Sequence, residues 1–579
     1  MANLARTAGY VSLTENYTTC LPIAPSVTNI QISVMAKENV STEEHSLNDE
    51  GNTDETLPMF DDLFKIIGEV GLFQVFMYVM YVLIEANGAT IILYFVLDIA
   101  NPGWFCPGSG VNVSSSTDLV KGYCDVSGLP CQNFSYSQEY TSTITEWDLI
   151  CDRKFIGSTM TSIFFVGNLI GATVFSSLSD LFGRKKALMA SWAVSMTLQL
   201  ASSWASVWVA YMILRFFTGV AAGGLISVST VVISEFLGPK WRSLAAYRIG
   251  WHFGPAIMIT SAYLLREWRY VSIVISVWTM PAFIVAVFFL PESARWLIQK
   301  KRYDQAEFWI KRMATMNRRS VPHLSNFVRL RGNEKTPCRY TCLDLFRSRR
   351  IAVMSLCVMY AWFSCAFISY GIAGQMSTLT GNIYLNLGIS MCATVFIQWI
   401  ICIYVPNWIG RRKTYPLFMG ITGLCMATVL ILDILKVAEN RIPQTVLAIT
   451  SSIIMSGAWA ASLLFATELY PTVIRNISTG AGNVAARIAG IIAPQAALLE
   501  MYHISAPYAV YGFLAITSSV AVYALLPETY GLPLPEHLDD VVKRAKVKVI
   551  NSSASIPLPE SANLCNSSIE SEENFVIEV

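Results

Sequence analysis

Long apolar stretches separated by short polar segments fill the chain between residues 70 and 526. A helix needs about 20 mostly apolar residues to cross the hydrocarbon core of a membrane, and these stretches are close to that length. We therefore predict an all-α polytopic membrane protein with twelve membrane-spanning helices. The predicted ranges are 70–96, 156–178, 186–206, 208–233, 244–265, 271–290, 351–373, 383–405, 414–435, 445–467, 477–499 and 507–526.

The polar signals between these predicted helices occur twice, in the same order and at nearly one spacing. The repeated segments are 181–186 (LFGRKK) with 408–413 (WIGRRK), Glu235 and Arg242 with Glu468 and Arg475, and 291–293 (PES) with 527–529 (PET). Three repeated signals indicate two pseudo-symmetric halves of six helices each. Duplicated membrane halves are typical of secondary transporters, which bind their substrate between the halves near the bilayer midplane.

Composition supports a membrane protein and excludes several function classes. Hydrophobic residues make up 54% and charged residues 14% of the 579 residues, against about 45–50% and about 25% in average soluble proteins. The basic clusters lie beside apolar helices, so nucleic-acid binding has no support. The sequence contains no phosphate-binding Gly-x-x-x-x-Gly-Lys-Ser/Thr segment, no metal-ligand spacing and no nucleophile–base pair, so we expect neither an enzyme nor an ATP-driven pump.

Lysine and arginine predict the orientation and the division of the chain. Fifteen of them lie in 292–350, and the other basic clusters fall on the same side if the helices alternate. Cytoplasmic loops carry the excess of Lys and Arg, so both termini are predicted to be cytoplasmic. The predicted parts are a tail 1–65, a first half 66–290 with an extracellular loop 97–155, a basic linker 291–350, a second half 351–530 and a tail 531–579.

The large predicted loop carries the marks of an extracellular segment. An even set of cysteines there predicts two disulfides, although the sequence does not choose among the three pairings. Two Asn-x-Ser sequons in the loop are predicted glycosylation sites. These residues are Cys106, Cys124, Cys131 and Cys151 for the disulfides, and Asn112 and Asn133 for the glycans.

Four segments resemble a known family. They are 145–152 (TEWDLICD), 235–242 (EFLGPKWR), 291–297 (PESARWL) and 468–475 (ELYPTVIR). With the repeated Gly-Arg turns, they resemble the organic ion transporters of the major facilitator superfamily, which include organic cation, organic anion and carnitine carriers. The resemblance covers residues from about 60 to 540. Sugar carriers share the Pro-Glu-Ser segment but lack the long loop with cysteines. Ser176 and Leu181 depart from the superfamily pattern, in which Gly and a basic residue are usual.

Charged residues near the predicted cytoplasmic helix ends are candidates for gating. Ion pairs that break and re-form would allow the halves to rock; an alternative is that the charges only anchor helix ends at the headgroups. The candidates are Asp180, Arg184, Glu235, Arg242, Arg411, Glu468 and Arg475. Arg215, deeper in the fourth predicted helix, needs a partner there and is expected to be structural or gating.

Arg487 is the main candidate for substrate binding. It lies deep in the eleventh predicted helix with no opposite charge within a turn or two, so we expect it to face a wet cavity. A guanidinium suits bidentate recognition of a carboxylate. The resemblance also implies a substrate with a carboxylate or similar anion, because cation carriers of the family have Asp at the matching position, whereas anion and carnitine carriers have Arg. The alternative is a buried ion pair with a distant helix.

Further cavity candidates are aromatic or polar. Aromatic faces bind flat organic bodies and quaternary ammonium groups, although lipid-facing or packing roles compete for each residue singly. Trp399 stands where many anion carriers of the family have Lys and carnitine carriers have an aromatic residue. The candidates are Tyr370, Trp362, Phe363, Trp399, Gln398, Asn87, Trp251 and His252, together with Glu85, which would couple transport to H⁺ or Na⁺ or pair with Arg487.

These features predict a plasma-membrane carrier that moves small organic anions or zwitterions such as carnitine by alternating access. The alternatives are an organic cation carrier and a non-transporting sensor on a carrier scaffold. We predict no cofactor apart from possible coupling to Na⁺ or H⁺. The residues 576–579 (VIEV) have the form of a ligand for a PDZ-type domain, with a plain tail as the alternative.

Overall fold

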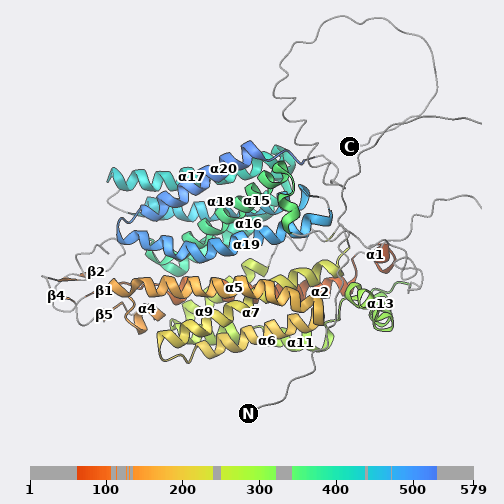
Figure 1. The fold of residues 1–579 in the computed structure, drawn as a ribbon. Coiled ribbons are helices and arrows are strands. Elements are labelled where there is room, and N and C mark those ends of the chain that lie inside the picture. The colour runs from red at the N-terminus through yellow and green to blue at the C-terminus, as the bar shows by residue number, and fades with distance from the viewer. Residues whose placement is uncertain are drawn as a thin grey trace, which may run out of the picture. The chain divides into compact units, whose positions relative to one another are not determined.

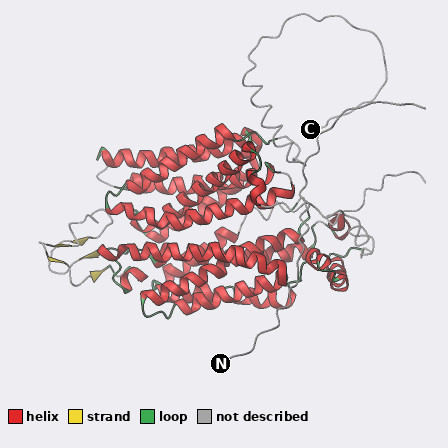
Figure 2. Cartoon of the chain, in the orientation of Figure 1, coloured by secondary structure: helices red, strands yellow, loops and turns green. Residues whose placement is uncertain are grey.

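The computed structural model describes residues 62–68, 70–105, 112–113, 125–126, 129–130, 135–137, 139–238, 241, 250–320, 342–436, 441–470 and 472–530. Helices dominate this part of the chain (Figure 2). Within it, nine helices are long and apolar enough to cross a membrane, and each of the twelve predicted ranges contains helix. The prediction of an all-α polytopic protein is confirmed.

The first half contains α1 to α11. Its helices are α1 (Asp62–Ile67), α2 (Leu72–Leu93), α3 (Phe95–Asp98), α4 (Thr143–Glu146), α5 (Lys154–Phe182), α6 (Arg184–Ser202), α7 (Trp208–Phe236), α9 (Gly250–Leu265), α10 (Trp268–Val277) and α11 (Met280–Phe289). The helix predicted over 271–290 is one candidate span, Trp268–Phe289, made of the two consecutive helices α10 and α11. Pro281 lies in the first turn of α11, and proline removes a backbone donor and disfavours continuation of the preceding helix.

Two short helices of the linker, α12 (Ala294–Gln299) and α13 (Tyr303–Met316), lead towards the second half. That half contains α15 (Arg349–Gly374), α16 (Ile383–Ile409), α17 (Arg411–Ile434), α18 (Ile442–Glu468), α19 (Thr472–Ala497) and α20 (Ala506–Leu525). Short 3₁₀ segments are η1 (Cys151–Arg153), η3 (Cys342–Phe346), η4 (Met376–Thr378) and η5 (Leu498–Met501).

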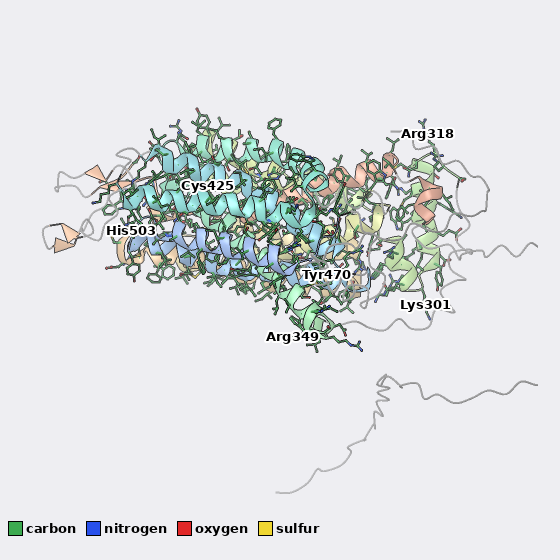
Figure 3. The ribbon with its side chains drawn as sticks, turned by 90° about the horizontal axis from the view of Figure 1, so that it is seen from above. Lys301, Arg318, Arg349, Cys425, Tyr470 and His503 are labelled. Carbon is green, nitrogen blue, oxygen red and sulfur yellow. The ribbon has the colours of Figure 1, made fainter. Side chains whose placement is uncertain are left out.

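The large predicted loop contains short antiparallel strands. β1 (Trp104–Phe105) lies between β2 (Asn112–Val113) and β5 (Ser135–Tyr136), and β3 (Asp125–Val126) pairs with β4 (Leu129–Pro130). The strands lie at one end of the helices, whereas α13 lies at the other (Figure 1). Figure 3 likewise shows His503 at one end, and Lys301 and Arg318 at the opposite end. We name these the loop end and the linker end.

Close packing makes a tight pair of α5 and α7. A Cβ added at any of four glycines would collide with a backbone carbonyl of the partner helix, so only glycine permits this approach. The four are Gly167 and Gly171 in α5, and Gly219 and Gly223 in α7. The first half meets the second where α5 contacts α19 and where α9 contacts α16.

Candidate functional site

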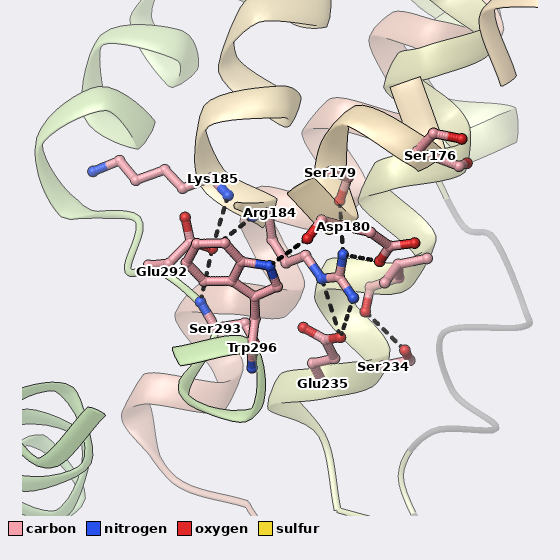
Figure 4. A network of polar contacts seen from close by, with 12 residues as sticks. Ser176, Ser179, Asp180, Arg184, Lys185, Ser234, Glu235, Glu292, Ser293 and Trp296 are labelled. Carbon is pink, nitrogen blue, oxygen red and sulfur yellow. Dashed lines mark hydrogen bonds and ion pairs between the residues drawn. The ribbon is translucent and has the colours of Figure 1, made fainter. Parts of the chain in front are cut away.

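A polar network surrounds Arg184 at the linker end of the first half (Figure 4). Its guanidinium pairs with Asp180 and Glu235, with 3.2 Å between Nη2 and Glu235 Oε1. Glu292 accepts hydrogen bonds from the backbone N–H of Arg184 at 2.7 Å and of Lys185 at 3.1 Å. A carboxylate there satisfies two free donors at the start of α6 and interacts favourably with the helix dipole.

The second half repeats the arginine and the two glutamates of this network, whereas Asn407 stands where the first half has Asp180. Arg411 pairs with Glu468, and Glu528 accepts from the backbone N–H of Arg411 at 2.9 Å and of Arg412 at 3.1 Å. The glycine before each arginine has a positive φ, +114° at Gly183 and +89° at Gly410. The sequence repeat is therefore also a repeat in the structure. In each half an arginine at the start of one helix pairs with a glutamate at the end of another, and a second glutamate accepts from the backbone N–H of that arginine.

Two other gating candidates are placed differently. Arg475 donates to the carbonyl of Tyr470 at 3.5 Å, and in the described part of the chain it forms no ion pair. Burial lowers the pKa of Arg475 and raises the pKa of Tyr470 to about 12. Arg242 lies outside the described residues.

Arg215 forms a buried cluster at the loop end of the first half. It is 1% exposed, its Nη2 lies 3.7 Å from Asp98 Oδ2, and its Nη1 donates to Gln199 Oε1 at 3.2 Å. Tyr211 donates to the same Asp98 oxygen at 2.6 Å, and the Arg215 guanidinium lies 4.5 Å from the centre of the Phe164 ring. Sequence reasoning missed Asp98, although an acidic residue at the end of a predicted span was a signal.

An ion pair, a hydrogen bond and ring contacts hold the segment around α4 against this cluster. Glu146 pairs with Arg269 and accepts from the Trp268 indole at 2.8 Å, and the Trp147 ring packs on Tyr211 and Trp268. These contacts explain Glu146 and Trp147 of the 145–152 segment, and Asp148 accepts from the Tyr136 hydroxyl at 2.8 Å. They join the end of the large loop to the first half.

Arg487 lies in the middle of α19, about 22 Å along the helix from Thr472. It is 7% exposed. Residues three and four positions apart share a helix face, so Arg487 shares a face with Gly490 and Ile491. Gly490 packs against Phe165 of α5, and the Ile491 carbonyl accepts from Ser162 at 2.7 Å. Arg487 therefore lies on the face of α19 that meets the first half.

Tyr370 also lies where the halves meet. Its ring centre is 4.7 Å from that of Phe165 and 6.4 Å from that of Phe95, both in the first half. Trp362 is instead packed inside the second half, where its ring meets Trp459 at 5.7 Å and its indole donates to the Ser462 carbonyl at 3.3 Å. Of the two, Tyr370 has the position expected of a group between the halves.

The polar candidates of the first half are buried in α2. Asn87 is fully buried, and within the described residues neither its Oδ1 nor its Nδ2 has a hydrogen-bond partner. Buried amides rarely lack partners, so this position has unused capacity to bind water or a ligand. Glu85 is buried and accepts from Ser229 at 3.0 Å. Trp251, in α9, is partly buried against the main core.

Other predicted residues are less completely placed. The side chains of Gln398 and Trp399, in α16, lie outside the described atoms, as does that of Asn112 in β2. Cys106, Cys124, Cys131 and Asn133 lie outside the described residues, and Cys151 begins η1. The disulfides, the glycans and the tail motif at 576–579 therefore stay predictions.

Polar contacts join the halves towards the loop end. Lys154 Nζ, at the start of α5, lies 3.4 Å from Glu500 Oε2 in η5. About two turns deeper along α5, Gln495 Nε2 donates to Ser162 Oγ at 3.0 Å. Tyr384 of α16 meets the ring of Tyr263 at 5.8 Å. Sequence reasoning missed the Lys154–Glu500 pair, since nothing in either segment identifies its partner.

Comparisons with known proteins give a consistent result. A family model described as "Sugar (and other) transporter" matches residues 129–539. Solute carrier family 22 member 7 of Bos taurus is 33% identical over 428 residues, which are 72% of this chain and 77% of that protein. The member 7 protein of Homo sapiens is 31% identical over 429 residues, with 72% and 77% covered. Member 6-B of Xenopus laevis is 29% identical over 460 residues, with 77% and 82% covered.

Solved structures share the fold at low sequence identity. The inward-open conformation of the xylose transporter XylE from E. coli matches with a TM-score of 0.56 and 15% identity, over 84% of this chain and 99% of that one. The proton:xylose symporter XylE bound to 6-bromo-6-deoxy-D-glucose matches with a TM-score of 0.53 and 16% identity, over 80% and 98%.

Proposed function

This chain belongs to solute carrier family 22, the organic ion transporters of the major facilitator superfamily, and from that premise we propose that it carries small organic anions or zwitterions. The relatives are transport proteins, so the chain is a membrane transporter and not an enzyme. Its predicted place is the plasma membrane, with both termini cytoplasmic. The linker end is then the cytoplasmic side, because it carries the basic linker.

The position of Arg487 is the observation that carries this proposal. A buried cation at mid-depth, on the face of α19 that meets the other half, is placed to receive an anionic group. A carboxylate matches the planar guanidinium with two parallel hydrogen bonds. Tyr370 and Phe165, beside the same face, supply aromatic surface for an organic body or an ammonium group. A zwitterion such as carnitine has both groups.

The polar contacts between the halves suggest which state the structure represents. Lys154, Ser162 and their partners hold the halves together towards the loop end. We infer a state closed on the extracellular side from these contacts. Alternating access then requires these contacts to break while the halves approach each other at the linker end.

Coupling to H⁺ or Na⁺ is a further part of the proposal. Glu85 is a buried carboxylate in α2 that accepts a hydrogen bond from Ser229 of α7. A carboxylate at membrane depth is a default candidate for a coupling role. Replacement by glutamine keeps the shape and removes the charge, so Glu85→Gln is expected to abolish any dependence of uptake on an ion gradient.

Uptake in cells that express the full chain tests the substrate class. The probes are radiolabelled carnitine, a dicarboxylate and tetraethylammonium, each measured with the unchanged chain and with Arg487→Ala. We expect carnitine or dicarboxylate uptake to fall by at least about tenfold in Arg487→Ala, because a charge-assisted hydrogen bond is lost. Arg487→Lys is expected to recover only part of it, since an ammonium lacks the planar fork.

The control is Arg312→Ala, which removes an exposed arginine from α13 and is expected to leave uptake unchanged. Surface abundance is measured for each variant. Tetraethylammonium uptake that is indifferent to Arg487→Ala would establish the organic cation alternative. Absence of saturable uptake of any organic ion by the purified protein in vesicles would support the sensor alternative.

A further inference from the structure

Asn168, in the middle of α5, is a buried amide at the contact between the halves. It is fully buried, and within the described residues neither its Oδ1 nor its Nδ2 has a hydrogen-bond partner. Such amides are rare in proteins, because the lost hydrogen bonds to water are not replaced. Packing alone does not account for an amide here, since an apolar side chain of similar size fills a buried position without that penalty.

The register between α5 and α19 brings Asn168 level with Arg487. The two helices run in opposite directions along their contact, where Phe165 packs against Gly490. Asn168 lies three residues from Phe165 towards the linker end, and Arg487 lies three residues from Gly490 in the same direction. Both steps are about 4.5 Å along a helix, and residues three apart share a face. Asn168 and Arg487 therefore lie at one depth, on the faces through which the two helices meet.

Open space adjoins this level on the side of the linker end. Gly480 lies about two turns from Arg487 towards the linker end, on the same face of α19. It is exposed, and a Cβ added there would meet no described atom within 4 Å. A substrate that reaches Arg487 through this space also comes within reach of the Asn168 amide.

An amide and a guanidinium at one depth suit an anion that carries one further polar group. The guanidinium takes up both oxygens of a carboxylate in two parallel hydrogen bonds. A second carboxylate would satisfy only the donors of the amide, and an ammonium group with N–H would satisfy only its acceptor. A hydroxyl group donates to Oδ1 and accepts from Nδ2, so it is the small group that satisfies both.

We propose that Asn168 is a substrate-binding residue that selects organic anions or zwitterions with a hydroxyl group close to the carboxylate. Its amide forms hydrogen bonds with that hydroxyl group while Arg487 holds the carboxylate. This role of Asn168 rests on the proposed function, in which Arg487 receives the anionic group.

Pairs of substrates that differ by one hydroxyl group test the role of Asn168. The pairs are carnitine with deoxycarnitine, and malate with succinate. Initial uptake of each radiolabelled compound is measured at low concentration in cells that express the full chain, and the ratio within a pair is compared between variants. We expect the unchanged chain to favour the hydroxylated member of the pair that it carries by about fivefold or more, which is the effect of one hydrogen bond to a buried group. In Asn168→Leu the ratio is expected to fall to about one, because no amide is left to bind the hydroxyl group.

A general loss of folding does not mimic this result, because both members of a pair are measured on the same variant. Asn168→Ala is measured as well, since it removes the amide without adding an atom that could collide with α7 or α19. The matched control is Asn386→Leu, which replaces another buried asparagine, near the start of α16, whose Nδ2 donates to the Thr380 carbonyl at 3.3 Å. This control is expected to keep the ratio of the unchanged chain.

The possible outcomes distinguish a failure of this role from a failure of the proposed function. Uptake that requires Arg487, with one ratio shared by Asn168→Leu, Asn168→Ala and the unchanged chain, would overturn the role of Asn168 alone. A ratio of about one or less in the unchanged chain would do so too, and so would an equal change of the ratio in Asn386→Leu. Uptake of neither pair, or uptake that is indifferent to Arg487→Ala, would overturn the proposed function and the role of Asn168 together.

Discussion

Arg215 shows how one buried charge is held at the residue scale. The partners described for it, Asp98, Gln199 and Phe164, come from three helices of the first half. Removing one member of a buried pair leaves an uncompensated charge, which destabilises a protein by about 3–5 kcal/mol. Replacing both partners by neutral groups removes that penalty.

We expect Arg215→Met to lower the thermal unfolding midpoint and the folded yield of the detergent-purified protein. The paired change Arg215→Met with Asp98→Asn is expected to recover a large part of both. Size-exclusion chromatography with a thiol-reactive unfolding dye measures the two quantities. Equal losses in the single and the paired variant would show that the charge pairing is not what stabilises this cluster.

Gly183 offers a second test at the residue scale. It has φ +114°, and an added Cβ would collide with Oε2 of Glu292. Gly381 has a similar φ of +103°, but the nearest atoms to an added Cβ belong to Asn386, 3.7 Å away. A positive φ is unfavourable for alanine at both positions, and at Gly183, where ψ is 153°, the conformation is one that essentially only glycine adopts, at a cost of about 1–3 kcal/mol to other residues.

Alanine at Gly183 is therefore expected to reduce uptake strongly, because it also displaces the Glu292 carboxylate from the start of α6. Alanine at Gly381 carries only the backbone strain and is expected to retain most of the uptake. Radiotracer uptake, normalised to surface abundance, measures both. Equal uptake by the two variants would mean that Glu292 contributes nothing beyond the glycine conformation.

At the element scale, Arg184 joins the start of α6 to the end of α7 through Glu235. Both side chains of this ion pair are largely buried, unlike the exposed pair of Glu307 and Lys311 in α13. Exposed pairs stabilise by about 0–1 kcal/mol, whereas a buried partner left alone is strongly destabilising. The two pairs are thus matched in chemistry and differ in burial.

We expect Glu235→Gln to lower uptake several-fold and Glu307→Gln to leave it unchanged. The charge exchange Arg184→Glu with Glu235→Arg is expected to restore part of the uptake lost in either single change. Initial uptake rates at a fixed surface abundance give the comparison. No recovery in the exchanged variant would argue that Arg184 and Glu235 act through other partners.

The elements also show where sequence reasoning succeeds and where it ends. The spans and the two halves were predictable because a membrane requires long apolar segments and because the Gly-Arg turns repeat. Pro281 accounts for the break between α10 and α11, which the sequence analysis does not predict. The partners of Arg215 and Lys154 were not predictable, since Asp98 and Glu500 are far from them in the sequence and only packing brings them together.

At the scale of the whole molecule, the described residues form two halves that meet along α5 and α19 and also along α9 and α16. If the carrier alternates, the contact between Ser162 and Gln495 must break in every cycle. By contrast, the hydroxyl oxygens of Tyr360 and Thr517 lie 2.7 Å apart within the second half, so these two residues should move together. Linking each pair covalently separates motion between the halves from motion within one half.

With cysteines at Ser162 and Gln495, a short bifunctional thiol reagent is expected to stop uptake. With cysteines at Tyr360 and Thr517, the same reagent is expected to leave most of the uptake intact. Uptake before and after treatment, with mass-spectrometric confirmation of the cross-link, provides the measurement. Continued uptake with the first pair fully linked would contradict a rocking motion of the halves.

The four glycines between α5 and α7 have a consequence for natural variation in this chain. The backbones of the two helices touch where these residues have no side chain, so even a methyl group meets a carbonyl that cannot move aside. Most single-nucleotide changes at a glycine codon introduce a larger residue. An inherited missense change at Gly167, Gly171, Gly219 or Gly223 is therefore expected to remove transport of every substrate alike, whereas a change at Arg487 would alter which substrates are carried.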